Sequence, residues 1–253
     1  MHKVVAFDLD STLIDENNQI IGGKDTIDRL HQLHKLGFKL LVNTGRLDHD
    51  IQNICLQYHL PIDGRISQNG AVIYHNNKLQ ATLLDSSQAL QFYDQVKDLS
   101  IRVEMNTISN RFWHSDRDPD FPKEFYDSSH IKADFKEIIL NQPVVLFLLI
   151  GNKDEIESAR QLVEQKFDQL DAVKTSETSL EILARGVSKG AALTQLFESM
   201  TLYAIGDSEN DYSMFDIAEK AYLIGKDKHP KAKNIHEILD ALDEILKIER
   251  QRP

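Results

Sequence analysis

The chain has 253 residues, of which 41% are hydrophobic and 27% are charged, and its formal net charge is -11. This composition is ordinary for a globular protein and excludes collagen-like, fibrous and disordered chains. The excess of 40 acidic over 29 basic residues argues against nucleic acid as a partner. No apolar run approaches the roughly 20 residues that span a bilayer, so no membrane partner is expected. The single cysteine, Cys55, and the absence of a signal-peptide pattern predict a cytoplasmic protein.

The first third of the chain alternates between apolar runs and helical patterns. Residues 4–7 predict a strand that is buried on both faces. Residues 24–36 predict a helix, and Gly37 ends it because glycine readily adopts the left-handed conformation that follows a helix. Residues 38–42 predict a second strand, and residues 48–66 predict a further strand and helix unit.

The same alternation returns near the C-terminus. Residues 202–205 predict a strand, residues 211–220 a short helix, and residues 221–224 another strand. One apolar stripe predicts the last helix, and its members are Ile235, Ile238, Leu239, Leu242, Ile245 and Leu246. Alternation at both ends predicts the α/β class with a doubly wound, mostly parallel sheet.

The middle of the chain follows a different pattern. Successive strands are expected at residues 101–105, 111–114, 144–150, 172–173 and 180–183. A helix is expected over residues 152–167 with Asn152 as its N-cap, and residues 116–130 are expected to be irregular. We therefore expect an inserted α+β domain at residues 83–186, between two halves of the first domain at residues 1–82 and 187–253.

Polar side chains follow the predicted strands at the points where the strands end. Asp8 and Asp10 come after the first strand, Thr44 after the second, and Asp207 after the strand at 202–205. The carboxyl ends of parallel strands gather at one edge of a sheet, where ligands bind. The sequence thus predicts that these side chains meet in one cleft, together with Lys189.

Several carboxylates in a small volume repel one another and need a counterion. Mg²⁺ prefers oxygen ligands and often binds a substrate phosphate as well. One carboxylate can attack phosphorus, and a second can protonate the leaving oxygen and later activate water. Lys189 could neutralise charge on the nucleophile and on the phosphate. The pattern therefore indicates phosphoryl transfer.

Four segments match a known family in order and near its usual spacing. The chain resembles the haloacid dehalogenase superfamily of phosphatases in Asp8-Leu9-Asp10-Ser11-Thr12, Val42-Asn43-Thr44-Gly45-Arg46, Gly186-Val187-Ser188-Lys189-Gly190 and Gly206-Asp207-Ser208-Glu209-Asn210-Asp211. Ser67-Gln68-Asn69-Gly70-Ala71 is similar to a segment of the Cof-like subfamily. Two departures are Ser11, where the first motif usually has glycine, and the stretch 224–227 after the fourth motif.

The resemblance implies a role for each matched residue. Asp8 would be the nucleophile and a Mg²⁺ ligand, and Asp10 would be the general acid/base that binds the metal through its backbone carbonyl. Asp207 would be the third protein ligand of Mg²⁺, and Asp211 would support the metal indirectly. The residues implied to bind the phosphate are Thr44, Gly45, Lys189 and Asn210. The segment 83–186 would be an α/β cap that selects the substrate.

The implied function is a Mg²⁺-dependent phosphatase that hydrolyses a small phosphorylated metabolite through an aspartyl-phosphate intermediate. Its substrate class would be a sugar phosphate or a phosphorylated cofactor, and Arg46, Arg111 and His114 are further candidates for substrate contacts. One alternative is a phosphomutase of hexose phosphates that uses the same chemistry. Non-enzymatic alternatives are a phospho-accepting signalling domain and an idle regulatory protein with this fold. The motifs do not specify the oligomeric state.

Overall fold

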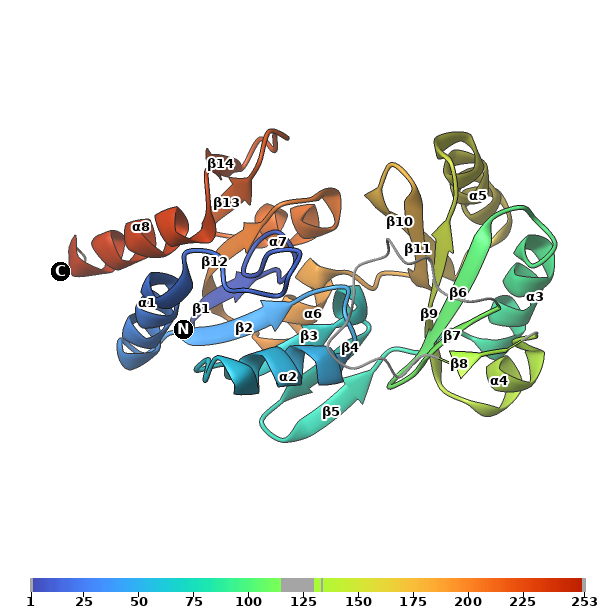
Figure 1. Cartoon of the computed structure of the whole chain (residues 1–253), viewed down its shortest axis with the longest axis horizontal. Helices are drawn as coiled ribbons and strands as arrows, with labels where there is room; N and C mark the ends of the chain where they lie inside the picture. The colour runs from blue at the N-terminus through green and yellow to red at the C-terminus, as the bar shows by residue number, and fades with distance from the viewer. Residues whose placement is uncertain (1, 115–129, 133, 252–253) are drawn as a thin grey trace. The chain divides into compact units, whose positions relative to one another are not determined.

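The computed structural model describes residues 2–114, 130–132 and 134–251. The chain divides into a core unit, Met1–Leu79 with Ser188–Pro253, and an inserted unit, Gln80–Val187 (Figure 1). We propose that these two units are the two domains expected from the sequence. In the described part of the chain, no helix combines the length and the apolar character needed to cross a bilayer.

The core unit is built on an eight-stranded sheet in the order β14-β13-β12-β1-β2-β3-β4-β5. The bounds are β1 His2–Phe7, β2 Lys39–Asn43, β3 Gly64–Ser67, β4 Val72–His75, β5 Lys78–Ala81, β12 Met200–Gly206, β13 Lys220–Ile224 and β14 Ala232–Ile235. The six strands from β14 to β3 are parallel, and β4 pairs antiparallel with β3. The mostly parallel sheet predicted from the sequence is confirmed.

Successive side chains of the central strands point alternately into two apolar cores, one on each face of this sheet. Val5 and Phe7 of β1 belong to one core, and Val4 and Ala6 belong to the other. The first core also includes side chains of α1 Gly23–Lys35, α2 Asp48–Gln57 and α8 Ile238–Gln251. The second includes side chains of α6 Lys189–Leu196 and α7 Tyr212–Ile217. Burial on both faces explains why the strands read as continuous apolar runs.

The inserted unit has a six-stranded sheet in the order β10-β11-β9-β6-β7-β8. The bounds are β6 Arg102–Thr107, β7 Arg111–Trp113, β8 His130–Ile131, β9 Val144–Ile150, β10 Leu170–Ser176 and β11 Ser179–Ala184. Neighbours are antiparallel except β7 and β8. One apolar core joins the sheet to three helices, α3 Ser86–Val96, α4 Lys136–Asn141 and α5 Lys153–Lys166. The predicted α+β character of the insert is confirmed.

Helix ends follow the local chemistry of the sequence. The Asn152 side chain accepts hydrogen bonds from the backbone N–H groups of Asp154 and Glu155, so the predicted N-cap of α5 is confirmed. Gly37 follows α1 with a φ of 85°, a left-handed conformation that a residue with a Cβ adopts only with strain.

Two expected helices have other bounds in the structure, and one expected irregular segment lies almost entirely outside the described residues. Ile235 ends β14, and α8 starts only at Ile238, because an inward-facing strand residue happened to match the helical spacing. The helix expected at 211–220 is shorter, since the 3₁₀ turn η2 (Glu209–Asp211) precedes α7 and Lys220 already belongs to β13. Of the irregular stretch expected at 116–130, only His130 is described, and it lies in β8.

The hairpin of β4 and β5 is not among the elements predicted from the sequence. Asn76 and Asn77 connect the strands with φ values of 51° and 59°. Asparagine tolerates this left-handed geometry, and two such residues in succession form the turn that best matches the twist of a hairpin. The pair Asn76-Asn77 was therefore an available signal.

Candidate active site

Three strand ends lie next to one another at the edge of the core sheet. β1 pairs in parallel with both β2 and β12, so residues that follow these strands emerge at the same edge. Asp8 follows β1, Thr44 follows β2 and Asp207 follows β12. The structure thus brings together side chains that lie up to about 200 residues apart in the chain.

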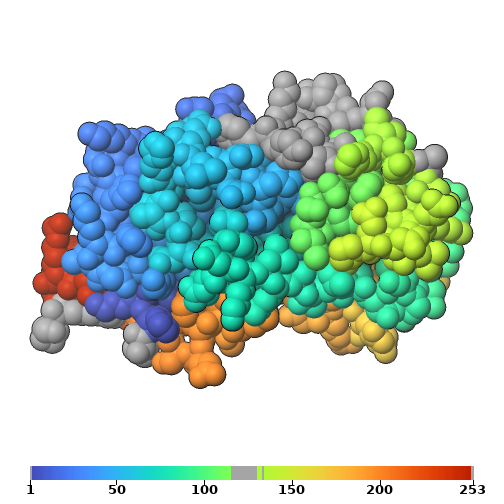
Figure 2. Space-filling view, turned by 90° about the horizontal axis from the view of Figure 1, so that it is seen from below, coloured from blue at the N-terminus to red at the C-terminus, as the bar shows by residue number. Residues whose placement is uncertain are grey.

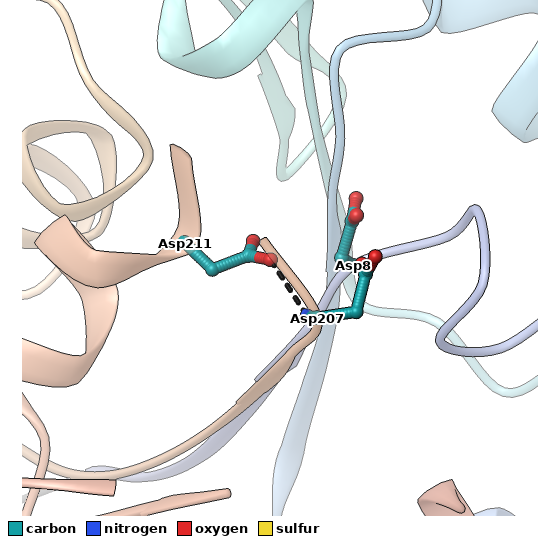
Figure 3. Close-up of side chains that lie close together, drawn as sticks. All are labelled: Asp8, Asp207 and Asp211. Carbon is teal, nitrogen blue, oxygen red and sulfur yellow. Dashed lines mark hydrogen bonds between the residues drawn. The ribbon is translucent and has the colours of Figure 1, made fainter. Parts of the chain in front are cut away.

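Asp8, Asp207 and Asp211 form a carboxylate cluster. Each offers one oxygen, and these three oxygens lie within 4.8 Å of one another (Figure 3). Both oxygens of Asp211 also have protein donors, because Oδ1 pairs with Lys189 and Oδ2 accepts from the backbone N–H groups of Asp207 and Ser208. Asp211 is therefore placed to orient the loop after β12, and Asp8 and Asp207 are the better placed pair to bind a cation directly.

Lys189 neutralises part of this negative charge. Its Nζ lies 2.9 Å from Asp8 Oδ1 and 2.7 Å from Asp211 Oδ1, and its side chain is fully buried. Burial acts to lower the pKa of Lys189, but the two neighbouring carboxylates outweigh it, so the net shift is upward. Lys189 therefore stays positively charged. The side chain of Ser188 caps the helix that begins with this lysine by accepting from Ala191 N.

Burial and, to a smaller extent, neighbouring carboxylates raise the pKa values of the other two carboxyl groups. Burial raises the pKa of Asp8 well above its usual value, against the opposing effect of Lys189. Burial, followed by the nearby charge of Asp211, raises the pKa of Asp207 to about 6. One lysine faces three carboxylates, so the cluster has surplus negative charge when all three are ionised. An all-oxygen donor set with surplus negative charge fits a hard divalent cation such as Mg²⁺, which prefers such ligands.

Two buried polar side chains with no role predicted from the sequence support the cluster. Thr12 Oγ1 donates to Asp207 Oδ1 over 3.2 Å. Asn43 Nδ2 donates over 3.0 Å to the backbone carbonyl of Lys189. Both residues stand inside the matched motifs, so the motifs themselves were the available signal.

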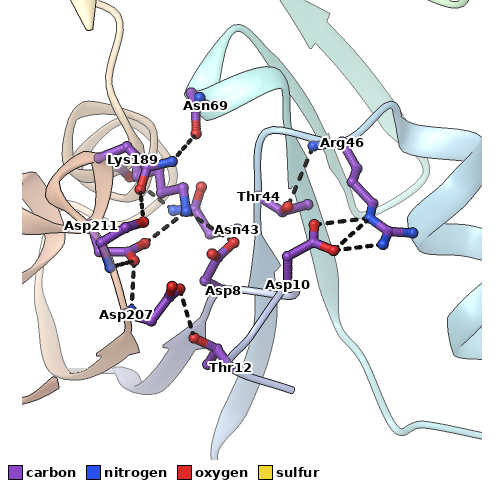
Figure 4. Close-up of polar contacts among 12 residues, drawn as sticks. Asp8, Asp10, Thr12, Asn43, Thr44, Arg46, Asn69, Lys189, Asp207 and Asp211 are labelled. Atoms are coloured by element: carbon purple, nitrogen blue, oxygen red, sulfur yellow. Dashed lines mark hydrogen bonds and ion pairs between the residues drawn. The ribbon is translucent and has the colours of Figure 1, made fainter. Parts of the chain in front are cut away.

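The residues expected to bind phosphate lie around the end of β2 and the turn η1 (Gln68–Gly70). Thr44 is buried, and its Oγ1 accepts a hydrogen bond from the backbone N–H of Arg46 (Figure 4). Gly45 lies between these two residues. Asn210 Nδ2 donates over 3.1 Å to Asn69 Oδ1, which links the fourth motif to η1. Gln68 and Asn69 have φ values of 51° and 53°. Asparagine tolerates this left-handed conformation, but glutamine adopts it with strain, which is common at functional sites.

Close backbone approaches explain two glycines of the site. A Cβ on Gly206 would lie 2.3 Å from the carboxyl carbon of Asp211. A Cβ on Gly70, whose φ is +103°, would lie 2.3 Å from the carbonyl oxygen of Ser188. These positions need glycine so that the loops carrying Asp211 and Lys189 can pack against their neighbours.

Asp10 and Arg46 lie beside the cluster and bind each other. Arg46 Nε lies 2.9 Å from Asp10 Oδ2, and its Nη2 lies 2.5 Å from Asp10 Oδ1. Arg46, expected as a candidate for substrate contacts, therefore directs its guanidinium to a carboxylate of the chain itself.

A family model described as haloacid dehalogenase-like hydrolase matches residues 5–243. The chain belongs to this family. The match spans the core unit and the inserted unit, so membership covers the whole arrangement described above. This hydrolase is therefore an enzyme of the superfamily that its four motifs predict.

Relatives and solved structures agree with this assignment. An HMP-PP phosphatase of Yersinia pseudotuberculosis serotype I (strain IP32953) is 26% identical over 234 residues, or 89% of this hydrolase and 84% of the relative. A haloacid dehalogenase-like hydrolase from B. subtilis shares the fold with a TM-score of 0.83 and 21% identity, over 96% of this chain and 99% of that chain. A HAD subclass IIB sugar phosphatase does so with a TM-score of 0.75 and 19% identity, over 98% of each chain. The prediction of a Cof-like phosphatase is confirmed.

Proposed function

We propose that this hydrolase is a Mg²⁺-dependent phosphatase of small phosphorylated metabolites and that Asp8 is its nucleophile. The observation that carries the proposal is the position of the Asp8 carboxylate, which contacts Lys189 and shares a cluster with Asp207. One Asp8 oxygen can face a cation while the other attacks phosphorus. Asp8, Asp207 and the backbone carbonyl of Asp10 would hold the Mg²⁺. When bound, the ion would neutralise phosphoryl charge and orient the ester.

The first half-reaction transfers the phosphoryl group to the protein. An Asp8 carboxylate oxygen attacks phosphorus, a new O–P bond forms, and the bond from phosphorus to the leaving oxygen breaks. Asp10 gives its proton to that oxygen, which departs as an alcohol. Lys189 compensates negative charge on the transferred group throughout.

The second half-reaction releases phosphate. Asp10, now without its proton, takes one from a water molecule as the water oxygen attacks phosphorus. The O–P bond to Asp8 breaks, inorganic phosphate leaves, and both aspartates return to their starting states. Thr44, Gly45 and Asn210 are proposed to hold the phosphoryl oxygens, since they surround the strand end that carries Asp8.

The substrate class is proposed from the relatives and the inserted unit. The HMP-PP phosphatase and the sugar phosphatase are both named as enzymes that act on small molecules. Their names support a sugar phosphate or a phosphorylated cofactor as the substrate of this hydrolase. We propose that the inserted unit, the α/β cap that the resemblance implies, selects the substrate. Arg111, expected as a candidate for substrate contacts, is buried, and its Nε donates to Asn106 Oδ1 within the inserted unit.

The test is phosphate release from p-nitrophenyl phosphate and from a panel of phosphorylated metabolites, with Mg²⁺ present. The wild type should release phosphate, and Asp8→Asn should lose turnover while keeping its circular dichroism spectrum and melting temperature within a few degrees. An active Asp8→Asn protein would refute the nucleophile assignment. Interconversion of hexose phosphates without net phosphate release would identify the phosphomutase alternative, and phosphorylation of Asp8 without turnover would identify the signalling alternative.

A further inference from the structure

The side chain of Arg46 is held by acceptors from three segments of the core unit. It binds Asp10 through Nε and Nη2, Asp50 Oδ2 through Nη1 over 2.9 Å, and Asn18 Oδ1 through Nη2 over 2.8 Å. Asp10 follows β1, Asn18 belongs to the loop before α1, and Asp50 lies in the first turn of α2. The guanidinium therefore has one defined position.

The two carboxylates on this guanidinium differ in freedom. Asp50 is fully buried and fixes Arg46 to α2, whereas the Asp10 side chain is 49% exposed. Asp10 is the partner that could turn, and Arg46 is the fixed point that decides its orientation. Figure 4 shows the Asp10 carboxylate directed to Arg46, while Asp8 and Asp207 lie on the side of Lys189.

We propose that Arg46 is a positioning residue that keeps the Asp10 carboxylate out of the carboxylate cluster and available to the leaving group. This inference rests on the proposed function. A divalent cation held by Asp8 and Asp207 would attract any further carboxylate nearby. Asp10 is only two residues from Asp8, and a side chain drawn onto the cation could not serve the leaving oxygen. The opposing charge of Arg46 prevents this diversion.

The chemistry gives the role a specific kinetic signature. A group that protonates the leaving oxygen matters most when that oxygen is a poor leaving group and least when it departs readily as an anion. Removal of the residue that positions the proton donor should therefore slow the hydrolysis of phenyl phosphate much more than that of p-nitrophenyl phosphate. A general loss of structure would slow both substrates equally.

The experiment compares two proteins, the parent Asp50→Asn and the double variant Arg46→Met/Asp50→Asn. The Asp50→Asn background is needed because removal of Arg46 alone would leave the buried Asp50 carboxylate without its positively charged partner. We expect kcat/KM for phenyl phosphate to fall by about 100-fold and that for p-nitrophenyl phosphate by less than about tenfold. Arg65→Met is the matched control. It removes another pairing with α2, to Asp48, and should change neither rate. Equal losses for both substrates in the Arg46→Met protein would overturn the proposal.

A second readout does not depend on turnover. Calorimetric titration of the metal-free proteins with MgCl₂ should show about fivefold tighter Mg²⁺ binding in the Arg46→Met protein, because a positive charge is lost and Asp10 is released. Adding Asp10→Asn should return the affinity to that of the parent. Unchanged or weaker binding after Arg46→Met would contradict the role.

The single variant Asp10→Asn separates this inference from the proposed function. If Asp10→Asn slows phenyl phosphate selectively and Arg46→Met does not, Asp10 is the acid and the role of Arg46 is wrong. If Asp10→Asn affects both substrates alike, the acid/base assignment in the proposed function itself fails.

Discussion

Lys189 Nζ lies 2.7 Å from Asp211 Oδ1, and both side chains are fully buried. The same ammonium group contacts Asp8, so the Lys189 side chain of the third motif links the first motif to the fourth. Removing either partner of a buried pair leaves a charge without compensation, which destabilises a protein more than the loss of an exposed pair does.

Lys189→Met tests this arrangement. Methionine matches the length of the lysine stem, but it leaves Asp8 and Asp211 without their shared cation. We expect the free energy of unfolding to fall by about 3–5 kcal/mol, as measured by urea denaturation, and turnover to be lost. Lys189→Met/Asp211→Asn should regain part of the stability but none of the activity. A Lys189→Met protein as stable as the wild type would show that the pair is not a stabilising link.

The raised pKa of Asp207 predicts a pH-dependent effect of Asp207→Asn in the metal-free protein. Because the folded pKa, about 6, exceeds the usual value, the wild type loses stability as pH rises from about 4 to 6 and the carboxyl group ionises in the folded state. Asparagine keeps the Oδ1 acceptor for Thr12 but carries no charge. The variant should therefore melt higher than the wild type at pH 7 and close to it at pH 4. A gain that is the same at both pH values would contradict the assigned shift.

Metal removal should abolish activity without unfolding the chain. The core unit has apolar cores on both faces of its sheet, so the fold does not depend on an ion at the sheet edge. Treatment with EDTA should stop phosphate release, and excess Mg²⁺ should restore it, while the circular dichroism spectrum stays constant. Full activity in EDTA would remove Mg²⁺ from the mechanism.

Gly206→Ala should damage the site through a steric clash. Its Cβ would lie 2.3 Å from the carboxyl group of Asp211, so the carboxylate must move away from Asp207 N or the loop must shift. We expect a loss of about 1–3 kcal/mol in unfolding free energy and a lower kcat. Gly22→Ala is the control, because its Cβ would clash with Thr26 Oγ1 at 2.5 Å on α1, away from the cluster. It should lower stability while leaving the rate per folded molecule unchanged.

Much of the fold follows from local patterns in the sequence. The strands before Asp8 and Asp207 appear as short apolar runs ending in acidic residues, and the rule that parallel strands end at one edge brings them together. The cap of α5 at Asn152 is equally local, since its partners are two and three residues away. Such features need no knowledge of the distant chain.

What the sequence did not reveal depends on distant pairing. Arg46 and Asp10 are 36 residues apart, and nothing local distinguishes a guanidinium that binds substrate from one that binds a carboxylate of its own chain. Thr12 and Asp207 are 195 residues apart. The expectation that Ile235 belongs to the last helix was wrong for a local reason. Ile235 ends β14 with its side chain facing inward, and it lies three residues before Ile238, so it matches the spacing of a helix face.

The pairing order of the core sheet has a consequence for synthesis on the ribosome. β1 lies between β2 and β12, yet β12 is translated only after the entire inserted unit. Until then, one side of β1 has no neighbour and exposes unpaired backbone groups, the kind of edge that invites wrong association. The nascent chain must therefore keep this strand out of aggregates for more than a hundred residues of elongation, and the carboxylate cluster is complete only when the last quarter of the polypeptide, with Asp207 and Asp211, has been made.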